Sequence, residues 1–182
     1  MKIGKHAYIG LGVVAALGIA MPGFAGGNKY DASTTQFVCH DTTGGEAGTV
    51  TLVGPLKLWP PNHKMIDEPV TAKSNNSGDM VSLTLTPVIT DATGGDGGAQ
   101  HDPDFNATSS DGKTIEASGT GSATAAMQLR AERSGKGDGR TYTINWKASF
   151  GPNSCSSDDG DGDHAPFVIS VPHDMRGGAD WK

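Results

Sequence analysis

The feature that most constrains the fold is a two-residue repeat of apolar and polar side chains that recurs along the chain. It is clearest in the segment TYTINWKASF, where the apolar positions are Tyr142, Ile144, Trp146, Ala148 and Phe150. Because successive side chains of a β-strand point to opposite faces, this pattern predicts a strand with one buried face. The same alternation recurs over residues 81–86, 127–132 and 167–171, with shorter candidates at 36–40, 49–53, 64–72 and 113–118.

Segments rich in Gly, Asp, Ser and Asn separate these stretches and predict turns. We expect the turn at 134–139 to join the strands around Met127 and Tyr142 as a hairpin. Only residues 123–133 are open to a helical interpretation, and the alternation itself argues against it. Seven to eight short strands predict an all-β fold, a single antiparallel β-sandwich.

The N-terminus has the features of a cleavable secretory signal peptide. Lys2 and Lys5 precede an uncharged, mostly apolar run at 7–21, and small residues at Gly23 and Ala25 suit a signal peptidase. The run is shorter than the ~20 apolar residues needed to span a bilayer. We therefore expect a secreted or cell-surface protein, with the periplasm as the alternative. The predicted organisation is a signal peptide at 1–25, a flexible arm at 26–34, the sandwich at 35–174 and a tail at 175–182.

The charge balance argues against anionic partners. The chain has 14 Lys and Arg residues and 20 Asp and Glu residues. Loss of Lys2 and Lys5 with the signal peptide leaves 12 basic residues against 20 acidic ones, so the mature net charge is near −8. Nucleic acids and anionic membranes repel such a chain, and metal cations are its more natural charged partners.

The chain has 2 cysteines, Cys39 and Cys155. In an oxidising compartment an even number of cysteines predicts a disulfide, with two free thiols as the alternative. The bond would tie the first strand region to a loop near the C-terminus.

The start of the most regular strand has the pattern of a tyrosine corner. Asp138 lies four residues before Tyr142, and Tyr142 lies two residues before the apolar Ile144. In such a corner the phenol bonds to backbone upstream and fixes the start of the strand. The alternative is an ordinary strand that begins with a tyrosine.

Three stretches together resemble a family of Ig-like modules, related to hyalin repeats (HYR), of secreted and surface-attached bacterial proteins. They are LWPPNHKM at 58–65, LRAERSGKGDGRTYTI at 129–144 and VPHD at 171–174, and the segment 91–105 resembles the acidic loop of the family. The resemblance implies an Ig-like extracellular sandwich used for display, adhesion or spacing, usually without catalysis. The chain differs from the family in having one module and in a longer last connection, 151–166, which carries Cys155.

The first of these motifs contains a rigid turn, because two prolines fix their own φ angles and keep the preceding residues extended. We expect Trp59 to cover the end of the core and His63 to hydrogen-bond across the turn. A ligand platform is the alternative function for Trp59 and His63. The turn itself consists of Trp59, Pro60, Pro61, Asn62 and His63.

Two short loops concentrate carboxylates, which repel one another unless a cation or solvent screens them. Oxygen ligands interleaved with glycine suit calcium, so we expect a weak extracellular calcium site in at least one loop, with solvated turns as the alternative. An EF-hand is excluded, because His164 and Ser170 stand where its glycine and glutamate belong. The candidate ligands are Asp91, Asp96, Asp102 and Asp104 in one loop, and Asp159, Asp161 and Asp163 in the other.

Other site chemistries have weaker support. A transition-metal site would use His101 with Asp102 and Asp104, or His164 with Asp163, although surface histidines explain both patterns. The sequence has no Gly-x-Ser-x-Gly elbow and no phosphate-binding glycine loop followed by Lys-Ser/Thr, so we expect no catalysis.

The expected function is therefore a non-catalytic, calcium-stabilised module of cell-surface adhesion, display or matrix association. Its partner would be a surface protein or glycan, and self-association is compatible with the pattern. The first alternative is a carbohydrate-binding module whose aromatic candidates are Trp59, Trp181, Tyr30 and Phe105. The second alternative is a metal-dependent hydrolase with catalytic carboxylates in the Asp loops.

Overall fold

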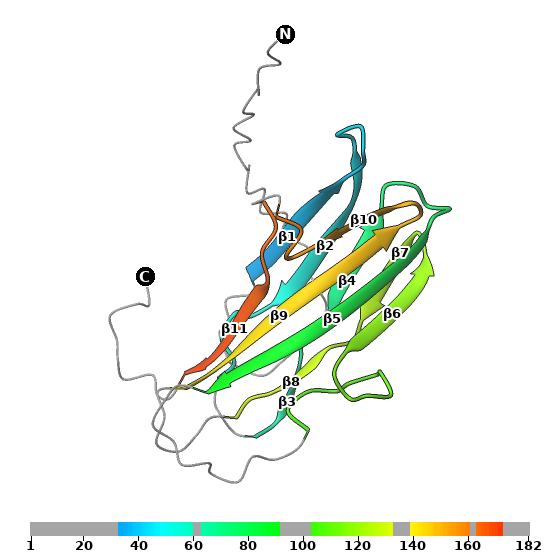
Figure 1. The fold of residues 1–182 in the computed structure, drawn as a ribbon. Helices are drawn as coiled ribbons and strands as arrows, with labels where there is room; N and C mark the ends of the chain where they lie inside the picture. The colour runs from blue at the N-terminus through cyan, green and yellow to red at the C-terminus, as the bar shows by residue number, and fades with distance from the viewer. Residues whose placement is uncertain (1–32, 60–62, 92–102, 133–138, 161–162, 173–182) are drawn as a thin grey trace, which may run out of the picture.

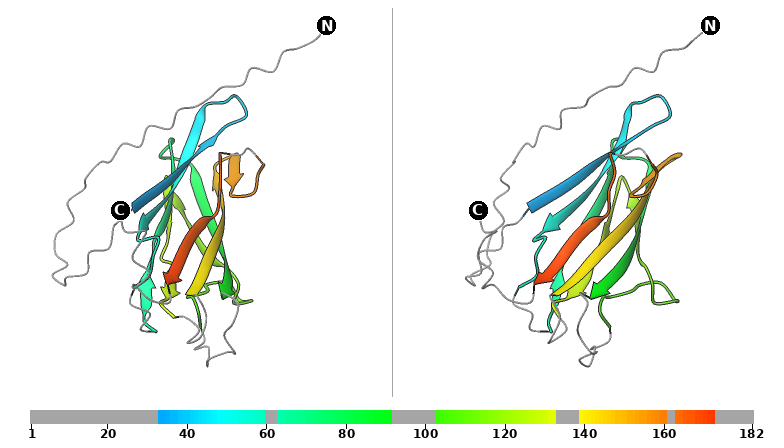
Figure 2. Two further views of the ribbon diagram at one scale, coloured as in Figure 1. Left: turned by 90° about the vertical axis from the view of Figure 1, so that its left-hand side faces the viewer. Right: turned by 60° about the vertical axis from the view of Figure 1, so that its left-hand side comes forward.

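In the computed structural model, the alternating segments form strands that hydrogen-bond into two facing antiparallel sheets, with a third, two-stranded sheet at one end (Figure 1). The structure describes residues 33–59, 63–91, 103–132, 139–160 and 163–172, and no helix occurs among them. The two main layers are seen from the side in Figure 2. The predicted all-β sandwich is thus confirmed.

The larger sheet is built on two long strands, β5 (Met80–Asp91) and β9 (Gly139–Phe150), which pair along their whole length. β6 (Ile115–Thr120) flanks β5. On the other side of β9, β11 (Phe167–Pro172) pairs with its first half and β10 (Asn153–Ser156) with its last residues.

The second sheet has the order β1-β2-β4-β7. β1 (Ser33–His40) and β2 (Glu46–Gly54) form a hairpin, whose turn projects beyond the neighbouring strands in Figure 2. β4 (Val70–Ser74) and β7 (Ser122–Ala125) complete this sheet. Two short strands, β3 (Met65–Asp67) and β8 (Gln128–Arg130), pair with each other at the end of the sandwich.

The core lies between the two main sheets and consists of the apolar positions of the alternation. Every second residue of β9, from Arg140 to Phe150, is buried, including the full aromatic side chains of Tyr142 and Phe150. Burial of these side chains removes apolar surface from water, which is the main favourable term in folding. Other large, fully buried side chains of this core are Leu52, Leu58, Leu83, Leu85, Met127, Leu129, Phe167 and Ile169.

The structure corrects the predicted hairpin around residues 134–139. β8 pairs with β3, whereas β9 pairs with β5, β10 and β11, so β8 and β9 are not hydrogen-bonded neighbours in the described structure. β8 belongs to the two-stranded sheet and β9 to the larger sheet, so the chain changes sheets between these two strands. Alternation assigns a face to each residue, but it does not choose the neighbouring strand, which explains the error.

Three further features of the strands differ from the sequence prediction. The segment predicted as one strand at 64–72 is two strands, because Pro69 has no N–H to donate and the N–H of Glu68 bonds to Met127 O at 2.7 Å. β7 lies at residues 122–125, where we predicted no strand. β10 lies within the connection 151–166, which we expected to be a loop.

Candidate functional site

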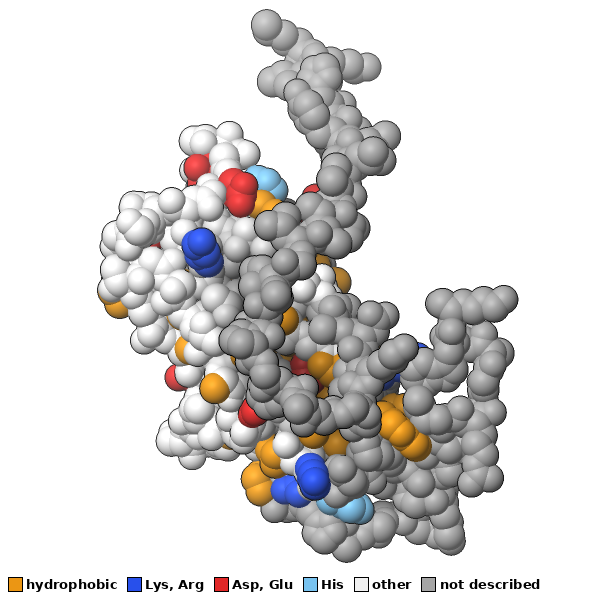
Figure 3. Space-filling view, turned by 180° about the vertical axis from the view of Figure 1, so that it is seen from behind, with side chains coloured by type: hydrophobic (Ala, Val, Ile, Leu, Met, Phe, Trp, Pro, Cys, Tyr) orange, Lys and Arg blue, Asp and Glu red, His pale blue; other side chains and the backbone are white. Residues whose placement is uncertain are grey.

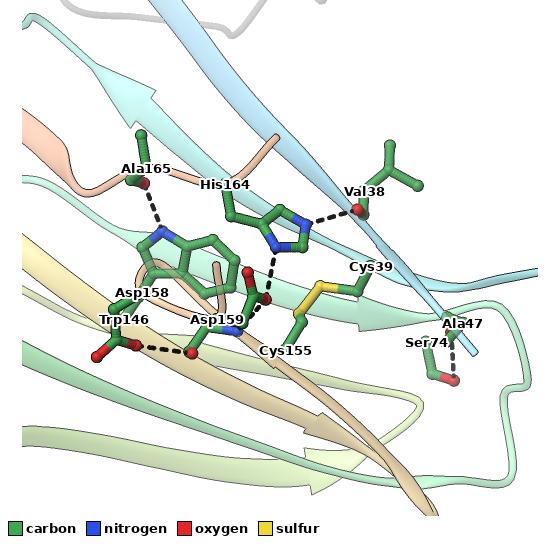
Figure 4. The surroundings of a disulfide bond; sticks show 11 residues. Val38, Cys39, Ala47, Ser74, Trp146, Cys155, Asp158, Asp159, His164 and Ala165 are labelled. Atoms are coloured by element: carbon green, nitrogen blue, oxygen red, sulfur yellow. Dashed lines mark hydrogen bonds and ion pairs between the residues drawn. A yellow bond between two sulfur atoms is a disulfide. The ribbon is translucent and has the colours of Figure 1, made fainter. Parts of the chain in front are cut away.

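The predicted disulfide is present and joins the two sheets. Cys39 of β1 is bonded to Cys155 of β10, with a Cα–Cα distance of 5.9 Å (Figure 4). Both cysteines are buried in the core. The bond therefore attaches the β1–β2 hairpin, at the edge of one sheet, to the end of the other sheet.

An aromatic cluster surrounds this bond. The rings of Phe37 and Trp146 stack with centroids 5.4 Å apart, and Phe167 lies 5.3 Å from Phe37. Trp146 is buried and donates its indole N–H to Ala165 O at 3.0 Å (Figure 4). The indole thus contributes both apolar area and one satisfied hydrogen bond to the junction of the sheets.

His164 closes this junction from the C-terminal side. Its side chain is 4% exposed, Nδ1 lies 2.7 Å from Asp159 Oδ2, and Nε2 lies 2.9 Å from the backbone oxygen of Val38 (Figure 4). A backbone carbonyl and an ionised carboxylate only accept hydrogen bonds, so both bonds form together when the imidazole carries two protons. The imidazole therefore connects Asp159 to the backbone of β1.

The aspartates of this loop mainly organise its turn. Asp158 Oδ1 accepts from Ser156 Oγ at 2.8 Å, and Asp159 Oδ2 accepts from Ser156 N–H at 3.1 Å. Asp159, one of the predicted calcium ligands, therefore has a protein partner, the His164 imidazole, with Nδ1 at 2.7 Å. Asp163 is exposed, and Asp161 lies outside the described residues.

A second cluster lies at the opposite end of β9. Arg140 is buried within the sandwich, and its Nη1 lies 2.5 Å from Asp104 Oδ1, in an ion pair with only 2% and 13% of the two side chains exposed. Burial of one charge without the other would be strongly unfavourable, so each requires its partner. Asp104, another predicted calcium ligand, is thus also paired with a cationic side chain.

Tyr142 lies beside this ion pair. Its phenol donates to the backbone oxygen of Arg130 at 2.8 Å and accepts from Arg140 Nη1 at 3.4 Å. Burial raises the pKa of the phenol, which remains a neutral hydrogen-bond donor. The predicted bond from Tyr142 to upstream backbone is present, and it connects β9 with β8; Asp138 lies outside the described residues.

Arg130 connects two loops to this cluster. Its Nε donates to Pro103 O at 2.9 Å, and its Nη1 donates to His63 O at 2.9 Å. Its backbone N–H donates to Asp104 O at 2.8 Å. One side chain therefore holds both the end of the acidic loop and the turn that follows Trp59.

Glu132 and His63 extend the network to the surface. His63 has a φ of 64°, its N–H bonds to Ala131 O at 2.9 Å, and its Nδ1 lies 3.5 Å from Glu132 Oε1. Glu132 is buried, and its Oε2 makes no hydrogen bond within the described ranges but lies 3.8 Å from Arg130 Nε. The described partners of His63 lie in and after β8, whereas the predicted hydrogen bond back across the turn concerns residues 60–62, which lie outside the described residues.

The motifs that suggested the family resemblance converge on this end of the molecule. Trp59 is half-buried, while Pro60, Pro61 and Asn62 lie outside the described residues. Val171 and Pro172 end β11, which pairs them with Arg140 and Gly139. The first two motifs contact each other here, through the pairing of β3 with β8 and the hydrogen bonds of His63 with Ala131 and Arg130.

Glu68 is a buried acid that the sequence analysis missed. It lies between β3 and β4 in the chain, its side chain is fully buried, and neither carboxylate oxygen has a hydrogen-bond partner among the described residues. Burial, together with the charge of Asp67, raises its pKa to about 8. Gly54 leaves the space it needs, because a Cβ at that position would overlap Glu68 Oε2. Only the interruption of the alternation before Pro69 could have marked this residue.

The remaining candidate ligands are not brought together within the described structure. Asp91 ends β5 opposite Arg140, while Asp96, His101 and Asp102 lie outside the described residues. Across the described ranges, no group of three or more His, Cys, Asp or Glu side chains is placed to hold a metal ion. Among the aromatic candidates for sugar binding, Trp59 and Phe105 are half-buried, and Tyr30 and Trp181 are outside the described part.

The outer faces of both sheets carry rows of uncharged polar side chains. Adjacent strands of the larger sheet align one row made entirely of serines: Ser154, Ser149, Ser82 and Ser118. The smaller sheet aligns Gln36, Thr51, Thr71 and Thr124, linked by Gln36 Nε2–Thr51 Oγ1 and Thr71 Oγ1–Thr124 Oγ1 distances of 3.0 Å each. In Figure 3, the visible described surface on one side of the molecule is mostly uncharged polar groups and backbone, with scattered charges.

These features define the chain as a disulfide-linked antiparallel β-sandwich with polar faces and internally paired charges. No protein-family model matches the chain, and a search of curated proteins finds no significant match. In the part of the chain that the structure describes, no helix has the length and apolar character needed to cross a membrane.

Proposed function

We propose that this chain is an exported, non-catalytic Ig-like module, related to hyalin-repeat domains, that acts in cell-surface adhesion, display or matrix association. The disulfide supports export, because such bonds persist mainly in oxidising compartments. The observation that carries the proposal is the distribution of polar groups. Rows of hydroxyl and amide side chains cross the outer faces beside a few exposed apolar side chains, whereas several ionisable groups of the two clusters bind one another.

The favoured contact surface is the outer face of the larger sheet. Its one charged row, Ser156-Lys147-Thr84-Glu116, combines a single positive and a single negative side chain, although the whole chain has a net charge of −6. A nearly neutral face with regularly spaced hydroxyls offers hydrogen bonds to a neutral, hydroxyl-rich polymer. The partner of this chemistry is a neutral matrix polysaccharide or surface glycan.

Co-sedimentation with insoluble neutral polysaccharides tests the proposal. Thr84→Glu with Thr143→Glu adds two charges to the face of the larger sheet, and we expect at least a tenfold loss of bound protein. The matched control, Thr71→Glu with Ser122→Glu, adds the same charges to the other sheet, away from β1, and should retain binding. Failure of the unmodified protein to bind any neutral polymer, or equal loss in both variants, would contradict the proposed surface.

The calcium component of the proposal depends on the aspartates that have no described cationic partner, because Asp104 and Asp159 are paired with Arg140 and His164. Calorimetric unfolding in millimolar calcium and in EDTA tests it. A ligand that binds only the folded state raises Tm with its occupancy. We expect a higher Tm in calcium, and the same Tm in both buffers would eliminate the calcium site without affecting the sandwich.

A further inference from the structure

The outer strand edges of the two sheets are not equally protected. Beside β11, the segment Leu56–Leu58 covers the edge, with Leu58 N to Ser170 O at 2.8 Å and Ser170 N to Leu56 O at 2.9 Å. On β6, the N–H of Glu116 bonds to Thr108 Oγ1 at 2.7 Å. β7 and β10 have only 4 residues each. Short or covered edges of this kind prevent pairing with other chains.

Among the described residues, none covers the edge of β1 at Thr34 and Gln36. It is an 8-residue edge strand, and its sequence STTQFVCH contains no Pro, Lys, Arg, Asp or Glu. Natural edge strands usually carry a charge, a proline or a covering segment where pairing has to be avoided. β1 therefore has the properties of an edge that is available for pairing.

The backbone groups that face away from β2 can be identified. Val38 O accepts a hydrogen bond from His164, so residue 38 points to the free side of the strand. By the two-residue period of the ladder, Thr34 and Gln36 point the same way. The backbone N–H and C=O groups of Thr34 and Gln36 have no hydrogen-bond partner within the described structure.

We propose that β1 is a self-association site, at which a second copy of this chain adds its own β1 in antiparallel orientation. The two 4-stranded sheets would then form one continuous sheet across a two-fold axis. Strand addition of this type gains its affinity from backbone hydrogen bonds.

His164 determines the register of this pairing. If Val38 of one copy lay opposite Thr34 of the other, the bond would need Val38 O, which His164 already occupies. If Thr34 lies opposite Gln36 of the other copy, only open backbone groups are used. The two-fold axis then passes through Thr35, and each copy supplies the same two residues.

The distribution of charge favours a second copy of the chain as the partner at the β1 edge. The chain has a net charge of −6, so two copies approach most easily where neither carries acidic groups. The outer face beside the edge consists of Thr34, Gln36, Thr49 and Thr51 with two exposed apolar side chains, Val38 at 36% and Val53 at 48%. Neutral polar and apolar side chains would therefore meet across the axis.

The edge is also held in place before association. The Cys39–Cys155 bond and the His164–Val38 contact fix the C-terminal half of β1 against the other sheet. A strand that is already ordered loses little conformational freedom when it pairs. The disulfide end of the sandwich thus presents β1 in an extended, rigid form.

Sedimentation equilibrium of the oxidised mature chain over a concentration series tests the proposal. We expect a monomer–dimer equilibrium, and a dimer Kd at least tenfold weaker for Gln36→Pro. Proline removes an N–H that makes no bond to β2, so the fold and the Tm should be retained. The matched variant Gln36→Thr keeps the backbone N–H and should dimerise like the unmodified chain.

A monomer at all concentrations, or a Gln36→Pro variant that dimerises normally, would overturn the proposal. Hydrogen exchange keeps the test decisive if the proline variant fails to fold. At concentrations where the unmodified chain is dimeric, the amides of Thr34 and Gln36 should be protected, and they should exchange freely on dilution. Free exchange in the dimer would place the interface elsewhere.

Discussion

The two ends of β9 hold the sandwich together by different chemistry. Near Trp146, a disulfide, stacked rings and one histidine attach an edge hairpin to the opposite sheet. Near Arg140, a buried ion pair and the Tyr142 phenol join β9 to β8 and to the acidic loop. We call these regions the disulfide end and the polar end.

The comparison shows how strand position determines the type of contact. β1 pairs only with β2 in its sheet, so it requires a link to the other layer, and the disulfide end supplies a covalent one. At the polar end, several chain segments meet without a shared ladder, and charged groups with several donors can bind many backbone oxygens at once. Reduction should therefore weaken the disulfide end, and loss of one charged partner should weaken the polar end.

Removal of the disulfide should have the largest effect. Replacement of both Cys39 and Cys155 by serine opens a loop with a sequence separation of 116 residues. The chain-entropy relation then predicts a loss of about 4–5 kcal/mol in the free energy of unfolding, measured by denaturant titration. Reducing agent should lower the stability of the unmodified protein similarly and leave the variant unchanged. A loss under about 1 kcal/mol would show that the aromatic cluster alone holds β1.

Arg140→Met should have the next largest effect, because it leaves the Asp104 carboxylate at the polar end without its cation. We expect a loss of about 3–4 kcal/mol in the free energy of unfolding. Lys147→Met is the matched control, since it removes a basic, exposed side chain from the outer face of the same strand. Its effect should stay within about 0.5 kcal/mol. Equal effects of the two substitutions would contradict a buried ion pair.

Glu68 should make the stability of the protein depend on pH. Its folded pKa of about 8 lies above its ordinary value of 4.5, so the folded state binds the proton more tightly than the unfolded state. Its stabilising effect is complete below about pH 4.5 and is lost as the pH rises towards 8. Glu68→Met should remove this dependence and increase stability at pH 8 by on the order of 2–3 kcal/mol.

Chemical denaturation of the two proteins at pH 4 and pH 8 measures the Glu68 effect. Glu116→Met is the control, because Glu116 is an exposed carboxylate on β6 and should leave the pH dependence unchanged. A parallel pH dependence in the Glu68→Met variant and the unmodified protein would show that this carboxylate is ionised when folded.

Tyr142→Phe should have the smallest effect of the series. It removes a buried hydroxyl that bonds to Arg130 O but retains the aromatic ring in the core. We expect a loss of about 1–1.5 kcal/mol from thermal or denaturant unfolding. Thr143→Val on the outer face should change stability by under about 0.5 kcal/mol. If both substitutions had the same effect, the phenol would not connect β8 to β9.

Local patterns in the sequence were sufficient to predict the strand character of most of the structure. The alternation in TYTINWKASF placed Tyr142, Trp146 and Phe150 on the buried face, because side-chain direction in a strand depends only on position along it. The pairing of Cys39 with Cys155 followed from their number and the expected oxidising compartment. The direction of a side chain in a strand depends only on the residues of that segment. The disulfide could be predicted because two cysteines allow only one pairing.

Tertiary structure alone decided which segments meet. Asp104 and Asp159 were predicted as candidate calcium ligands, and the structure places them beside Arg140 and His164, which lie 36 and 5 residues away along the chain. The pairing of β8 with β3, and the burial of Glu68 beside Gly54, likewise depend on the folded arrangement. Alternation repeats every two residues and is nearly the same in every strand, so it cannot specify long-range neighbours, which depend on loop paths and on packing between the layers.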